Sequence, residues 1–261
     1  MSGPSLHQRS ISGERIPVWD EMIRLGDSIR EEPVLSDALA VVREVVDRSH
    51  RNLRAIHDRL VSLGYEFAKP EAALVEAGPG AVEQVRALEA RLGTFPLLIR
   101  EWYLGLASVD FSQSRSQEAG PTESCVGGLG FNCSLIMQSL SGCWEQWEGL
   151  AREHAEDART ARESGHGTFG PEHLPAFLAL GPRASNCDPM GFRLPNLGVD
   201  GVFYNDGAGD AYFIDHLRDV FEWGGFPFCG WYSKHRRHPF LSARPDVEKV
   251  LPILKDGLLP L

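Results

Sequence analysis

The sequence lacks the features that mark membrane and secreted proteins. No apolar run approaches the roughly 20 residues that cross a bilayer, and no basic segment followed by an apolar one opens the chain. The five cysteines form no CxxC pair and have no regular spacing, which is typical of reduced thiols in a cytosolic protein. We therefore expect a cytoplasmic protein without a membrane segment or a disulfide framework.

Positive charge is scarce, with 26 Lys and Arg residues against 36 Asp and Glu residues and a formal net charge of -10. Such a chain repels phosphate backbones and anionic lipid surfaces, so we expect neither a nucleic-acid nor a membrane partner. The basic cluster Lys234–His238 is short and more consistent with a solvated face than with a nucleic-acid footprint. An acidic surface suits a basic protein partner, although many ordinary cytosolic proteins are equally acidic.

Motifs of common catalytic sites are also missing. The sequence contains no GxSxG, HExxH or GxxxxGK[ST] pattern, and the glycines at 127–130 lack the spacing of a phosphate loop. Cys133 with His166 or His173 is a conceivable thiolate pair, but a buried inert thiol is the commoner fate. The most closely clustered carboxylates are those of Asp206, Asp210 and Asp215. Their spacing does not match that of a calcium-binding loop, and roles in turns and as a helix cap explain all three. We expect no catalytic residue, no cofactor and no metal.

The most structured stretch runs from residue 201 to residue 227. Two short runs of aromatic and β-branched residues flank the glycine-containing turn 206–210, which predicts a β-hairpin. Asp215 stands where an N-cap belongs, and apolar residues then recur at helical spacing. Gly224, Gly225 and Pro227 predict where that helix ends.

Further helices and strands follow from apolar periodicity and from breaking residues. We expect a loose tail over 1–16, a short helix from Pro17 to about residue 31, and a long helix capped by Ser36 or Asp37 and ending near Leu63. The histidines of that long helix, His50 and His57, need no metal to explain them. The remaining predicted elements are a strand at 65–67, helices at 81–92 and 97–106, strands at 109–111 and 174–180, and a last helix within 245–261 that could cover a sheet edge.

A helix from Gly142 to about Ser164, with Ser141 as its cap, combines aromatic and acidic residues. Trp144 and Trp147 begin an apolar stripe that fades to alanine, so the first half should dock and the second half should be solvated. A tryptophan pair at this spacing packs in a core more often than it anchors an interface.

The string ALEARLGTFPLLIREWY at 87–103, followed by the strand-like residues 108–111, resembles the opening of the SMI1/KNR4 family, also called the SUKH superfamily. The tract 177–227, which ends in FIDHLRDVFEWGGFP, is similar to a bacterial branch of that family, and HRNLRAIHDRLVSLGYEF at 50–67 resembles the helix that precedes the domain there. The resemblance spans roughly residues 40 to 230.

The resemblance implies an α+β fold, with a mixed or antiparallel sheet packed by helices and an N-terminal helical extension. Together with the polar, aperiodic composition of the first residues, it divides the chain into a disordered tail at 1–16, an extension at 17–78 packed on the core, and an SMI1/KNR4-like domain at 79–261. It also implies a non-catalytic role, either as an immunity protein that neutralises a toxin, often a nuclease, or as a regulatory adaptor with no toxin partner. An enzyme with an unrecognised site is the third reading.

For the toxin-binding role, the protein should be a monomer when free and should bind its cognate toxin domain, a basic one being favoured, through acidic and aromatic surface. The candidate contact residues lie on the helix 142–164 and at the hairpin tip: Glu145, Glu148, Glu153, Glu156, Asp206 and Asp210.

Overall fold

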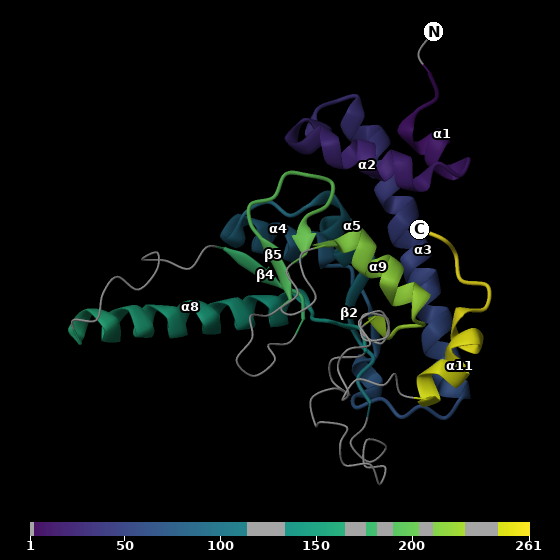
Figure 1. The fold of residues 1–261 in the computed structure, drawn as a ribbon. Coiled ribbons are helices and arrows are strands. Elements are labelled where there is room, and N and C mark those ends of the chain that lie inside the picture. The colour runs from purple at the N-terminus through teal and green to yellow at the C-terminus, as the bar shows by residue number, and fades with distance from the viewer. Residues whose placement is uncertain (1–2, 114–133, 165–175, 182–189, 204–210, 228–244) are drawn as a thin grey trace, which may run out of the picture.

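The computed structural model describes residues 3–113, 134–164, 176–181, 190–203, 211–227 and 245–261. The fold is α+β, with helices packed around short antiparallel strands (Figure 1). This confirms the expected fold class, while the specific SMI1/KNR4-like arrangement and the domain boundary at residue 78 stay predictions. The strands belong to three small sheets in the described residues, in place of one larger sheet.

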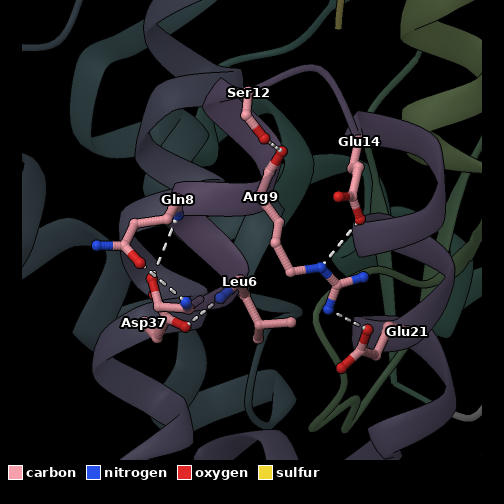
Figure 2. A network of polar contacts seen from close by, with 8 residues as sticks. Leu6, Gln8, Arg9, Ser12, Glu14, Glu21 and Asp37 are labelled. Atoms are coloured by element: carbon pink, nitrogen blue, oxygen red, sulfur yellow. Dashed lines mark hydrogen bonds and ion pairs between the residues drawn. The ribbon is translucent and has the colours of Figure 1, made fainter. Parts of the chain in front are cut away.

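The N-terminal residues fold against the long helix, so the loose tail expected over 1–16 is wrong for much of its length. Helix α1 (Leu6–Ile11) opens with a capping box between Ser5 and Gln8. The backbone amide of Leu6 also donates to the carboxylate of Asp37 at 2.6 Å (Figure 2). The amide of His7 donates to the same carboxylate at 3.1 Å. These bonds satisfy amides that a short helix cannot satisfy internally, which explains why six residues suffice here.

Helix α2 (Arg15–Leu25) and the 3-10 helix η1 (Gly26–Arg30) follow, close to the predicted span. Arg9 joins α1 to α2, because its guanidinium pairs with Glu14 at 3.0 Å and Glu21 at 2.7 Å (Figure 2). Val18, Trp19 and Met22 bury the inner face of α2.

Helix α3 (Val34–Ser62) is the longest element, and it packs on α1, α5 and α11. It begins at Val34, two residues before Ser36, and neither Ser36 nor Asp37, the two predicted caps, caps this helix. The Ser36 hydroxyl donates to Glu32, and Asp37 instead caps α1. The apolar stripe of α3 is buried as its spacing predicts, including Val42, Leu53 and Ile56.

Helices α4 (Ala81–Leu92) and α5 (Leu97–Gly105) occupy the predicted spans, and α5 leads directly into strand β2 (Leu106–Asp110). Strand β2 pairs antiparallel with β1 (Leu74–Glu76) and with β3 (Ile136–Met137). The 3-10 helix η2 (Pro70–Ala72) precedes β1, which was not predicted, and the strand expected at 65–67 is only the isolated bridge between Phe67 and Gln113.

Strand β4 (Phe177–Ala179) pairs with β5 (Gly191–Arg193), and β6 (Val202–Phe203) pairs with β7 (Ala211–Tyr212). The second pair confirms the hairpin. Helix α9 (Phe213–Glu222) then begins with Tyr212 at the N-cap position, so Asp215 is not the cap and instead pairs with Arg218, three residues further along the helix. Gly224 and Gly225 have φ values of 57° and 95°, which confirms the predicted stop.

Helix α11 (Pro245–Lys255) lies along α3, and therefore covers a helix and not the expected sheet edge (Figure 1). The segment after it is held on α3, where Asn52 exchanges two hydrogen bonds of 2.8 Å with the backbone of Leu259. Buried side chains from α2, α3, α5 and α9 belong to one hydrophobic cluster, with Trp102 and Phe213 in edge-to-face contact at its centre.

Candidate functional site

Helix α8 (Leu140–Glu163) carries most of the predicted contact residues and is held mainly by its first turns. Leu140 and Cys143 are buried there, and Ser139 accepts from the Gly142 amide at 3.2 Å. Ser139 is thus the N-cap, and Ser141, the predicted cap, instead lies 3.0 Å from the Ser139 hydroxyl. From this anchor α8 runs outward, so that its C-terminal half lies away from α3, α9 and α11 (Figure 1).

The four glutamates predicted on α8 are all exposed, as expected for a solvated face. Glu145 and Glu148 form no ion pair with any residue that the structure describes. Glu156 lies 3.6 Å from Arg159, and Glu153 interacts with other groups of the chain. The nearer half of α8 therefore exposes carboxylates that no cation of the described chain neutralises. Asp206 and Asp210, predicted at the hairpin tip, lie outside the described residues.

The two tryptophans of α8 pack partly against the hydrophobic cluster. Their ring centroids are 5.3 Å apart with an interplanar angle of 33°. The guanidinium of Arg91, from α4, lies 4.6 Å from the ring centroid of Trp144. The expected docking of the first half of α8 is confirmed, and its partner is α4 together with strand β4. The second half is solvated as expected for most of its length, except that Ala158 is buried.

A groove with a volume of about 350 Å³ opens between α4 and the start of α8. Its apolar lining comes from small side chains and from a few larger ones: Ala81, Ala87, Leu88, Tyr103, Ala107 and Trp144. Gln84, Arg91, Ser139 and Ser141 add polar groups. The sequence did not reveal this groove, because α4 and α8 are far apart in the chain; the available signal was the recurrence of alanine along α4.

Beneath the groove, Tyr103 and Cys143 are both fully buried. The Tyr103 hydroxyl donates to the Gln138 carbonyl at 2.8 Å and lies 3.4 Å from the Cys143 sulfur. Burial raises the pKa of Cys143 to about 12 and the pKa of Tyr103 well above its ordinary value. The Cys143 thiol is therefore neutral and a poor nucleophile. Cys133, His166 and His173, considered above as a thiolate pair, lie outside the described residues.

Asp200 is the most perturbed carboxyl described. Burial raises its pKa to about 7, although the amides of Ile214 and Gly201 donate to it at 3.0 and 2.7 Å and favour the ionised form. The indole N–H of Trp19 also favours the ionised form of Asp200 and so opposes the rise in its pKa, although the geometry at Trp19 Nε1 is too poor for a regular hydrogen bond. Because Ile214 lies in the first turn of α9, Asp200 acts as the cap that was predicted at Asp215.

The histidines of the described helices have environments that explain them as packing residues. Burial lowers the pKa values of His50 and His216 to about 4, so both are neutral at physiological pH. His50 meets Trp102 edge-on at 5.3 Å, and His57 stacks on Phe67 at 5.2 Å. Among the described residues, no three or more His, Cys, Asp and Glu side chains are grouped to hold a metal ion.

No protein-family model, curated protein or solved structure matches the chain. In the described part of the chain, none of the helices combines the length and apolar character that crossing a bilayer requires.

Proposed function

We propose that the chain is a non-catalytic, cytoplasmic protein-binding module, namely an immunity protein that binds and neutralises a toxin domain with a basic surface. The observation that carries the proposal is the acidic face of α8, defined as Glu145, Glu148, Glu153 and Glu156. All four side chains are exposed, and the helix that presents them buries Leu140 and Cys143 in its first turns and Ala158 near its end.

The physical basis is charge complementarity. A row of carboxylates on a helix that stands out from the body attracts a basic surface at a distance and raises the association rate. Glu145 and Glu148 suit this role best, since no described cation competes for them. Many toxins that act on nucleic acids need basic clefts, because their substrates are polyanions.

The resemblance of residues 87–103 and 177–227 to the SMI1/KNR4 family supports the same role by analogy. In the structure, the first of these stretches covers the second half of α4 and most of α5, and α4 packs directly on α8. The proposed contact surface is thus continuous with the part of the chain that carries the resemblance.

The test is co-expression with the toxin domain encoded beside this gene, followed by measurement of the association rate of the purified pair. We expect the double variant Glu145→Gln/Glu148→Gln to lower the association rate about tenfold at low salt and to weaken its salt dependence. The matched control, Asp20→Asn/Glu31→Gln, removes two exposed charges from the N-terminal part and should leave the rate unchanged. Unchanged toxicity without a complex refutes the proposal.

A further inference from the structure

The groove between α4 and α8 has the size and lining of a small-molecule site. Its volume of about 350 Å³ lies within the usual range of ligand pockets, near the lower end. Ala81, Ala87 and Ala107 leave the space that larger side chains would fill, while Trp144 supplies flat apolar surface. Such a lining favours a compact apolar group.

The charged group of this groove is Arg91. Its guanidinium lies over the Trp144 ring at 4.6 Å, which orients the side chain, and it forms no ion pair with a residue of the described chain. A guanidinium presents planar paired donors that match the two oxygens of a carboxylate. The groove therefore combines an apolar lining with an unneutralised cation.

A second donor lies at the same groove. The hydroxyl oxygens of Ser139 and Ser141 are 3.0 Å apart, and Ser139 also accepts from the Gly142 amide. One of the two hydroxyl protons is used within this pair, so the other is left to donate to a ligand. Both side chains line the groove.

We propose that this groove binds a small organic carboxylate with a compact apolar body. The carboxylate pairs with Arg91 and accepts from the one hydroxyl of Ser139 and Ser141 whose proton is free, while the apolar body lies against Ala81, Ala87 and Ala107. The site is independent of the toxin-binding role, because it rests on the groove and not on the acidic face of α8.

Two probes with the same apolar body and opposite charge test the proposal: 2-naphthoate and (2-naphthyl)methylammonium, titrated by calorimetry into the full chain. We expect 2-naphthoate to bind about tenfold more tightly, since the contact to a charged donor is worth roughly this factor. Arg91→Gln should lower the affinity for 2-naphthoate about tenfold and abolish the preference.

Two further variants separate the groove from general surface effects. Arg86→Gln removes an exposed arginine of α4 that does not line the groove, and it should leave both affinities unchanged. Ala87→Leu places a larger side chain in the groove from an exposed position, and it should weaken both probes. Equal or tighter binding of the ammonium probe, no binding of 2-naphthoate at millimolar concentration, or equal effects of Arg91→Gln and Arg86→Gln overturns the proposal.

Discussion

Asp200 holds the start of α9 from the preceding loop, and its burial makes folding depend on pH. In the folded chain its pKa is about 7, against an ordinary value of 3.8, so the folded state binds the proton more tightly. Its contribution is therefore fully present below about pH 4 and is lost as the pH rises towards 7. His50 and His216 act in the opposite direction, because their lowered pKa values make the fold lose stability as the pH falls from 6.5 towards 4.

The variant Asp200→Asn separates these effects, since the histidine contributions cancel in the difference between the two proteins. We expect the stability of the wild type, relative to Asp200→Asn, to fall by on the order of 2 kcal/mol between pH 5 and pH 8. Urea unfolding at both pH values measures it. A difference that stays constant or rises over this range contradicts the proposed environment of Asp200.

Features that depend on a residue's own backbone conformation could be predicted from the sequence, whereas helix caps supplied by residues distant in the chain could not. Gly224 and Gly225 end α9 as predicted, because a left-handed backbone depends on the residue itself. Asp200 lies 14 residues before the amide of Ile214, and Asp37 lies 31 residues after the amide of Leu6. Only tertiary packing brings such pairs together, so the sequence predicted Asp215 as the cap of α9 and no cap for α1, and it assigned Asp37 to α3 instead.

At the scale of elements, two glycines with different surroundings should respond in opposite ways to an added methyl group. Gly149 lies in the middle of α8 with nothing within 4 Å of a Cβ built there, so Gly149→Ala should stabilise the fold by about 0.5–1 kcal/mol. A Cβ at Gly191 in β5 meets the Leu178 carbonyl oxygen of β4, so Gly191→Ala should destabilise by about 1–3 kcal/mol.

Thermal unfolding of both variants measures these effects against the wild type. If Gly191→Ala is neutral, the β4–β5 pairing described here is wrong. If Gly149→Ala destabilises instead, the side of α8 that carries Gly149 is covered by another part of the chain.

The helices were easier to predict than the strands for a related reason. Helices α4, α5 and α9 show their apolar stripes over nine residues or more. Strand β1 has three residues and owes its pairing to β2, so no periodicity could reveal it. The groove between α4 and α8 was likewise hidden, since it forms only where the two helices meet.

At the scale of the whole molecule, α3 connects the two ends of the described chain. Its Asp37 caps α1, and its Asn52 holds Leu259 through two hydrogen bonds of 2.8 Å. Asn52→Ala should therefore lower the free energy of unfolding by about 2 kcal/mol and speed hydrogen exchange at the Leu259 amide. Arg51→Gln, which removes an exposed ion pair from the same helix, should change it by less than about 0.5 kcal/mol.

The contact between Asn52 and Leu259 also bears on protein synthesis, because its two residues are 207 positions apart. At a translation speed of roughly 5–20 residues per second, Leu259 is synthesised on the order of 10–40 s after Asn52. During that interval the nascent polypeptide exposes the surface of α3 that α11 later covers. Until the last residues are synthesised, that apolar surface is open to non-native association.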